Sequence, residues 1–146
     1  MMNKSYFRGF TLIEMLVVVA IFAILSSIVL ASVVSAKANA RDAKRVESVR
    51  QLENALDLYK NSSSRYPICN PEVVIDGSGD CLSAALISAG AMNITPVDPT
   101  GESLGTCGQG DSFVYCYQSA DGVSYNIRYH LETNTIKSSG WYNETP

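Results

Sequence analysis

The chain is poor in the residues that build catalytic and metal sites. Its 146 residues include one histidine, one tryptophan and four cysteines, and no two cysteines form a CxxC pair. No residue pattern typical of a nucleophile, a metal site or a phosphate site is present. We therefore expect neither enzymatic activity nor a resident cofactor, and function must come from structure or binding.

Charge is missing from a long stretch near the N-terminus. Residues 15–36 carry no charged side chain, and residues 10–36 carry only Glu14. As a helix, residues 10–36 would extend about 40 Å, enough to cross a hydrocarbon layer of about 30 Å. Glu14 costs roughly 3 kcal/mol in such a segment, which is less than the many apolar side chains contribute. The segment is therefore predicted to be a transmembrane helix.

Three interpretations of this segment compete. It is an ordinary membrane anchor, a secretory signal peptide, or the helix of a precursor whose short polar leader is removed ahead of the apolar run. Ala38-Asn39-Ala40 has the A-x-A form that signal peptidase prefers. However, an apolar region of about 25 residues exceeds the usual 7 to 15, and an acid within it is atypical of signal peptides.

The residues ahead of the apolar segment favour the third interpretation. Arg8-Gly9-Phe10-Thr11-Leu12-Ile13-Glu14 resembles the processing site of type IV pilins and of the pseudopilins of type II secretion. The resemblance implies that prepilin peptidase cuts between Gly9 and Phe10, removes residues 1–9 as a leader, and that Phe10 is then N-methylated. It also implies that Glu14 neutralises the N-terminal amine of an adjacent subunit during assembly.

The same resemblance implies a function, partners and a location. The chain is expected to be the structural subunit of a type IV pilus-like filament that polymerises through its N-terminal helix. The implied partners are further copies of the chain, prepilin peptidase, the membrane and an inner-membrane assembly platform. The precursor would have a cytoplasmic N-terminus and an outside head, and would then enter an extracellular or periplasmic filament. Two alternatives are a major pseudopilin of a type II secretion system and a minor tip pilin that binds DNA or a surface.

The charges that flank the apolar segment favour the opposite orientation. Two basic residues precede it, and five follow it: Lys37, Arg41, Lys44, Arg45 and Arg50. The positive-inside rule places the more basic flank in the cytoplasm. We nevertheless expect an outside head, because the processing motif needs a cytoplasmic Gly9 and the cysteines suit an oxidising compartment.

The helix is predicted to continue beyond the membrane, to about Ser62. No proline or glycine occurs between Ala36 and Pro67. Many members of the family carry a proline near the middle of the apolar segment, where this chain has Ala31. Apolar residues follow one another at spacings of three or four along the continuation: Ala43, Val46, Val49, Leu52, Leu56 and Tyr59. Residues 37–65 are therefore expected to form an amphipathic helix packed on a small sheet.

Residues 66–146 are predicted to form the head of an α+β, pilin-like fold. A short helix is expected over residues 83–92, and strands over 112–118, 123–131 and 135–142 in an antiparallel meander. In the second strand, alternate residues from Val123 to Leu131 form one apolar face, and His130 lies on the polar face. This part holds two basic and nine acidic residues, so 2 - 9 = -7, which disfavours binding to nucleic acid.

All four cysteines lie in the head: Cys69, Cys81, Cys107 and Cys116. An even number in a small domain beside a membrane segment indicates two disulfides. A zinc site is the alternative, but the spacings match no common ligand pattern. Sequence proximity favours Cys69 with Cys81 and Cys107 with Cys116.

One loop of the head raises the question of calcium. Asp98-Pro99-Thr100-Gly101 resembles a loop in the major pseudopilins of type II secretion, where nearby acids bind calcium. Asp98, Asp111 and Asp121 could supply oxygen ligands. Since no fixed ligand spacing is visible, these acids are expected to be solvated loop residues, with calcium as the alternative.

Overall fold

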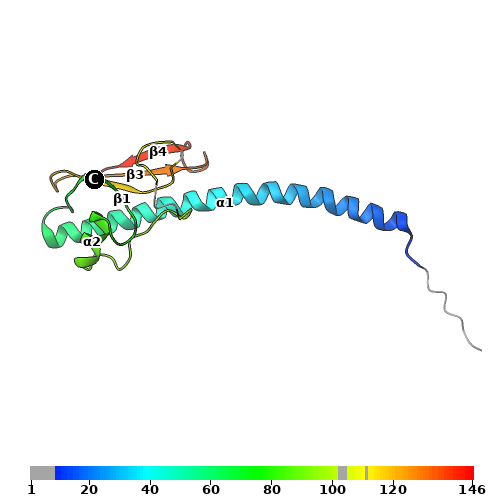
Figure 1. Ribbon diagram of the computed structural model, residues 1–146, viewed down its shortest axis with the longest axis horizontal. Coiled ribbons are helices and arrows are strands. Elements are labelled where there is room, and N and C mark those ends of the chain that lie inside the picture. The colour runs from blue at the N-terminus through cyan, green and yellow to red at the C-terminus, as the bar shows by residue number, and fades with distance from the viewer. Residues whose placement is uncertain (1–8, 102–104, 111) are drawn as a thin grey trace, which may run out of the picture. The chain divides into compact units, whose positions relative to one another are not determined.

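The computed structural model describes residues 9–101, 105–110 and 112–146, with only the backbone of Ala31. In chain order, the elements are α1 (Leu12–Ser63), β1 (Cys69–Val74), α2 (Cys81–Ser88), β2 (Cys116–Ser119), β3 (Asn126–Leu131) and β4 (Gly140–Glu144) (Figure 1). The chain divides into two compact units, residues 1–37 and residues 38–146.

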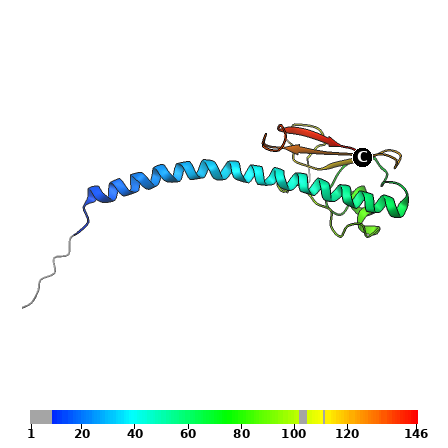
Figure 2. The same ribbon diagram turned by 180° about the vertical axis from the view of Figure 1, so that it is seen from behind.

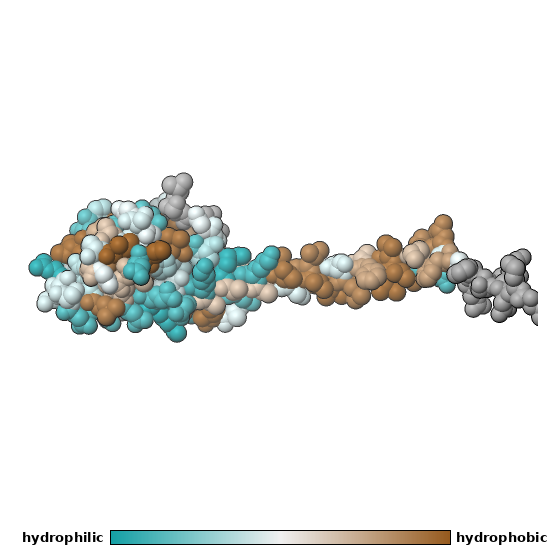
Figure 3. Space-filling model, turned by 90° about the horizontal axis from the view of Figure 1, so that it is seen from below, coloured by the Kyte–Doolittle hydropathy of each residue, from teal (hydrophilic) through white to brown (hydrophobic). Residues whose placement is uncertain are grey.

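The first unit contains the apolar part of α1. Its large apolar side chains are all exposed, and Figure 3 shows them as a continuous hydrophobic surface. The hydroxyl of Ser27 donates to the carbonyl of Ile24 at 2.7 Å and that of Ser32 to Ile28 at 3.2 Å, so both are satisfied within the helix. Among the described residues, α1 is the one helix that is long and apolar enough to cross a membrane.

The predicted length of α1 is confirmed to within two residues at each end. No break occurs in the helix between Leu12 and Ser63. It ends where Ser64 adopts a left-handed φ of 60° and donates its N–H to the Lys60 carbonyl at 2.7 Å. Pro67 follows and cannot extend the helix.

In the second unit, one face of α1 packs on the sheet (Figures 1 and 2). The predicted apolar stripe is buried at Val49, Leu52 and Leu56, and Val46 and Tyr59 pack at the edge of the core. The prediction is wrong at Ala43, which is exposed. The buried face instead continues toward the N-terminus through polar residues: Asp42, Arg45 and Ser48.

The sheet has four antiparallel strands in the order β1-β2-β3-β4, so the predicted three-stranded meander lacked one strand. Cys116 pairs with Arg128 between β2 and β3, and Tyr129 pairs with Tyr142 between β3 and β4. The missed strand, β1, is an edge strand that contains Pro71 and has an irregular register against β2. Proline in a short run argues against a strand, although it is tolerated at a sheet edge.

Several predicted boundaries are also shifted. Residues 112–115 lie outside the strands, although the Tyr115 carbonyl accepts the N–H of Ile75 at 2.8 Å, so β2 begins only at Cys116. The last strand was predicted over 135–142, but β4 begins at Gly140. The side chain of Asn134 accepts the N–H of Ser139 at 2.6 Å, which holds the intervening residues in a turn.

The core is completed by α2, which was predicted over residues 83–92 but covers Cys81–Ser88. Asp80 caps its N-terminus by accepting the N–H of Ser83 at 2.9 Å. Beyond its end, Gly90 has a φ of 68°, which favours glycine and stops the helix. Leu82 and Leu86 are fully buried in the core with Leu52.

Two disulfides fasten the head. Cys69–Cys81 joins the start of β1 to the start of α2, and Cys107–Cys116 joins the following loop to the start of β2. No cysteine is free. The two pairs are those that sequence proximity favours.

Substitution of Leu52 should test how much the head depends on packing against α1. Leu52 is 0% exposed, so Leu52→Ala is expected to lower the free energy of unfolding by about 2–5 kcal/mol. The matched control is Leu58→Ala on the same helix, where the side chain is 58% exposed and a change within about 0.5 kcal/mol is expected. Chemical denaturation followed by near-ultraviolet circular dichroism measures both. Equal losses would contradict this packing.

Candidate functional site

The predicted cleavage site lies in an accessible, non-helical segment. Gly9 and Phe10 precede the first residue of α1, and both are exposed, Phe10 to 71%. A Cβ atom placed on Gly9 would meet nothing within 4 Å. A peptidase can therefore approach the bond between Gly9 and Phe10 without unwinding the helix. The basic residues of the leader, Lys4 and Arg8, lie outside the described residues.

Immediately after this bond, Thr11 and Glu14 form a capping box at the start of α1. The Glu14 carboxylate oxygen Oε2 accepts the Thr11 N–H at 2.8 Å and the Thr11 hydroxyl at 2.6 Å. In return, the Glu14 N–H donates to the Thr11 hydroxyl oxygen at 3.3 Å. This reciprocal pairing satisfies N–H groups that have no partner within the first turn of a helix.

The capping box gives Glu14 a local role beside its expected role in assembly. The carboxylate bonds to Thr11, the residue that follows Phe10, where cleavage would create an ammonium group. Both of these bonds use Oε2, and Oε1 makes no hydrogen bond to any described residue. A role for Glu14 was predicted from the sequence, but one for Thr11 was not, although the T-x-x-E spacing is a recognisable signal for a capping box.

A second polar site lies inside the head, around Arg45. We call it the Arg45 cluster and define it as five residues: Arg41, Asp42, Arg45, Asp98 and Glu132. Arg45 is 0% exposed. Its Nε and Nη2 atoms donate to the two carboxylate oxygens of Asp98 at 2.6 and 3.0 Å. Its Nη1 atom donates to Asp42 at 2.8 Å and to Glu132 at 2.5 Å.

The remaining contacts close the cluster. Arg41 donates through Nε to Glu132 at 2.7 Å and also pairs with it through Nη2. Asp42 accepts the N–H groups of Glu132 and Thr133 at 3.0 and 2.8 Å, and the Thr133 hydroxyl at 2.7 Å. The Arg45 guanidinium also lies 4.5 Å from the centre of the Phe113 ring. The cluster thus connects α1 to the chain beyond β3.

These contacts shift the pKa values of Asp42, Arg45 and Glu132. Burial alone would raise the pKa of Asp42, but hydrogen bonds from Glu132, Thr133 and Arg45 outweigh it and hold that pKa below its ordinary value. Hydrogen bonds from Arg41 lower the pKa of Glu132 against the opposing effect of burial. Burial would lower the pKa of Arg45, but its bonds to Asp98 and Glu132 raise it. All three groups are therefore charged at neutral pH.

The structure describes two of the three candidate calcium ligands, Asp98 and Asp121, and gives them different contacts. Asp98 is buried and bound to Arg45, and it also accepts the N–H and hydroxyl of Thr100 at 2.9 and 2.7 Å. Asp121 is exposed and caps its own turn by accepting the Val123 N–H at 2.9 Å. Asp111 lies outside the described residues. Within the described ranges, Asp98 and Asp121 share no ligand cluster with a third acid, histidine or cysteine.

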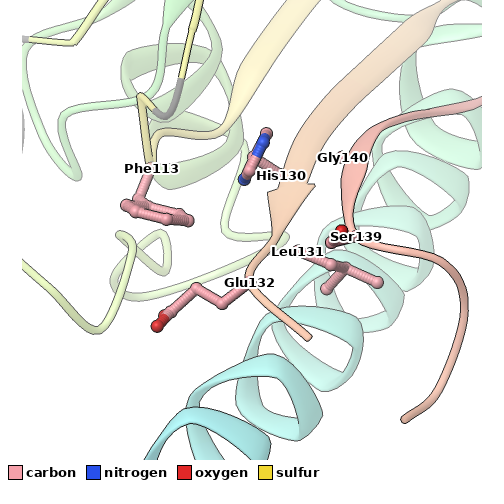
Figure 4. A pocket seen from close by; sticks show the side chains of 6 residues that line it. All are labelled: Phe113, His130, Leu131, Glu132, Ser139 and Gly140. Atoms are coloured by element: carbon pink, nitrogen blue, oxygen red, sulfur yellow. The ribbon is translucent and has the colours of Figure 1, made fainter. Parts of the chain in front are cut away.

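His130 lies on the side of β3 opposite the core, as expected, and this side of the strand is covered at His130. The imidazole is 8% exposed because the rings of Phe113 and Trp141 pack against it at centroid distances of 5.0 and 5.5 Å. Figure 4 shows it beside a pocket of about 500 Å³. Among the described residues that line the pocket, Glu132 is the carboxylate, and it is already paired with two arginines.

Acid should weaken the head through the Arg45 cluster. The pKa values of Asp42 and Glu132 are depressed in the folded chain, so their contribution is complete above the unfolded values of about 4. It is lost as pH falls through the folded values, because the unfolded chain then binds more protons. We expect the free energy of unfolding to fall between pH 5 and pH 2.5, as measured by denaturant titration.

The control for this measurement is a pair of variants. Asp42→Asn should flatten the acid limb of the stability profile, because it removes one of the titrating groups. Asp57→Asn changes an exposed aspartate on the same helix and should preserve the wild-type profile. A profile that is unchanged in Asp42→Asn would contradict this assignment.

Comparison with known proteins agrees with the geometry at the N-terminus. A family model described as the prokaryotic N-terminal methylation motif matches residues 4–30. The chain is 34% identical over 116 residues to the type II secretion system core protein G of Escherichia coli strain K12, covering 77% of this chain and 80% of that protein. It is 35% identical over 114 residues to the Klebsiella pneumoniae protein of the same name, covering 73% and 81%.

A third relative extends the agreement to another genus. Core protein G of Vibrio cholerae serotype O1 is 34% identical over 105 residues, which cover 70% of this chain and 72% of that protein. No solved structure matches the chain. The methylation motif and the extent of these alignments confirm the resemblance to pilins and pseudopilins, and the chain belongs to the type II secretion system core protein G family.

Proposed function

We propose that the chain is a pseudopilin that polymerises as a structural subunit of a type II secretion system. The observation that carries this proposal is the family membership, together with an accessible Gly9–Phe10 bond ahead of an apolar helix. Among the possibilities raised by the sequence, the relatives favour the major pseudopilin over the type IV pilus filament. Each relative described above is named core protein G, which also disfavours a minor tip subunit.

Maturation would begin with removal of residues 1–9 by prepilin peptidase and methylation of Phe10. The new amine would then be positive and close to the carboxylate of Glu14. Two opposite charges that are buried together cost much less than either charge alone. Pairing between Glu14 of one copy and the amine of another would therefore fix the axial stagger of adjacent helices.

The exposed apolar part of α1 would supply the driving force. Its large apolar side chains from Leu12 to Val34 are all exposed, and Figure 3 shows a largely hydrophobic surface along this part of the helix. A lipid bilayer would cover this surface before assembly. In a filament, the same surface would be buried against other copies of the helix, so that neither state leaves it in water.

The cluster also bears on the orientation of the precursor. Arg41 and Arg45 contribute to the basic flank that the positive-inside rule would keep in the cytoplasm, yet both are paired with acids in the folded head. Lys37, Lys44 and Arg50 remain exposed. The folded head is thus less basic near the helix than the sequence indicates. Together with two disulfides, this supports a periplasmic head on an inner-membrane precursor.

Mass spectrometry of the native protein should find a chain that begins at Phe10 and carries one additional methyl group. In a host without prepilin peptidase, the same protein should keep residues 1–9. The disulfide masses can be read from the same sample. A mature chain that begins at Met1, or after Ala40, would overturn the proposal.

Substitution of Glu14 should separate its two roles. Glu14→Gln keeps an acceptor for the capping box but removes the charge, and it should abolish secretion in a deletion strain while leaving membrane insertion intact. Thr11→Val removes the hydroxyl of the box and keeps the charge, so it should have a smaller effect. Glu47→Gln, on an exposed part of the same helix, is the control. Full secretion with Glu14→Gln would contradict charge pairing.

A further inference from the structure

The Arg45 cluster gathers segments that are far apart in the sequence. Asp98 lies 53 residues from Arg45, and Glu132 lies 87 residues from it. The first belongs to the loop after α2, and the second directly follows β3. Both meet α1 one turn before the apolar core begins at Val49. Arg45 is therefore the residue of α1 to which two separate segments of the head are bound.

The apolar core and the cluster hold the head in different ways. Hydrophobic burial is roughly proportional to area and has no preferred direction. Arg45 instead presents three nitrogen atoms in a rigid plane, and each must meet a carboxylate oxygen at hydrogen-bond distance. A slide or rotation of the head by even part of a turn would break these bonds.

We propose that Arg45 is a positioning residue that sets the register of the head on the polymerising helix. This inference rests on the proposed function, because a filament of identical copies needs every head in the same place on its helix. The buried cation is otherwise hard to explain, since apolar residues of similar volume commonly stabilise a protein as well as a buried ion pair does. Its directionality is what an apolar residue could not supply.

The charges around Arg45 predict opposite responses to acid in the wild type and in a variant that lacks this arginine. Arg41 and Asp42 face it from α1, Asp98 from the loop, and Glu132 from the end of β3. Among the described residues, Tyr115 and His130 are the other titratable groups that pack nearby, His130 through Phe113. Without Arg45, three carboxylates would remain with one half-exposed arginine. Acid would relieve their repulsion, whereas acid weakens the wild-type cluster.

The test uses the full chain in detergent micelles and three variants: Arg45→Met, Arg45→Lys and, as the exposed control on the same helix, Arg50→Met. Hydrogen exchange is followed at the N–H groups of Thr100 and Thr133, which bond to Asp98 and Asp42. In Arg45→Met we expect their protection factors at pH 7 to fall at least tenfold, with a change below threefold at Ile127 in the centre of the sheet. Arg50→Met should match the wild type.

Two further results decide between positioning and mere stability. The protection factors of Thr100 and Thr133 should rise in Arg45→Met between pH 7 and pH 5, whereas those of the wild type should not. Arg45→Lys keeps the charge but cannot form the fork to Asp98, so it should recover less than half of the loss. A wild-type pH response in Arg45→Met, or full recovery in Arg45→Lys, would overturn the proposal.

Secretion in a deletion strain gives the functional readout. Arg45→Met should be inserted and processed like the wild type, but should restore secretion at least tenfold less well, and Arg50→Met should restore it fully. Normal secretion with Arg45→Met would overturn the positioning role. If the wild-type chain itself fails to restore secretion, the proposed function is wrong. The hydrogen-exchange data would still test whether Arg45 fixes the segments around Thr100 and Thr133.

Asp98→Asn covers the case in which Arg45→Met does not fold. It leaves Arg45 paired with Asp42 and Glu132, so the head should remain intact. Exchange should then accelerate at Thr100, next to the altered side chain, and stay unchanged at Thr133. Equal acceleration at both positions would contradict separate fixation of the two segments.

Discussion

The structure depends on one helix that keeps its backbone hydrogen bonds unbroken while its surroundings change along its length. From Leu12 to Val34 its large apolar side chains are exposed within the described chain, whereas from Val46 onward the head covers one face. A helix can pass between such environments because its backbone groups are satisfied internally. The absence of proline and glycine over this stretch is therefore the constraint on which both units rely.

In the head, a small sheet is held against α1 by three kinds of interaction. Its apolar core lies under the centre of the sheet, and the two disulfides fasten β1 and the long loop before β2. The Arg45 cluster supplies directional contacts at the end of the head nearest the apolar part of α1 in the sequence. Apolar packing, disulfide bonds and ion pairs thus stabilise different parts of the head.

The sequence predicted features that depend on local patterns. The extent of α1 followed from the distribution of helix breakers, and Leu52 and Leu56 followed from helical periodicity. Features that depend on long-range contacts were missed, including β1, whose Pro71 is acceptable only because no further strand pairs beyond it. Strand alternation placed His130 on the polar face of its strand, but it could not predict that Phe113, from another segment, packs against the imidazole. Asp42 and Arg45 continue the spacing of the buried stripe. Their burial was not predicted because charged residues are usually exposed, and because their partners lie up to 91 residues away in the sequence.

The capping box at the start of α1 has a consequence for maturation. The amide of Thr11 belongs to the second residue after the cut, so it keeps its proton, and the methyl group would be added one residue earlier. The first turn of the helix can therefore stay as it is while the bond before it is broken. Maturation would then act as a change of charge in front of an already folded helix, and assembly would require no refolding of its end.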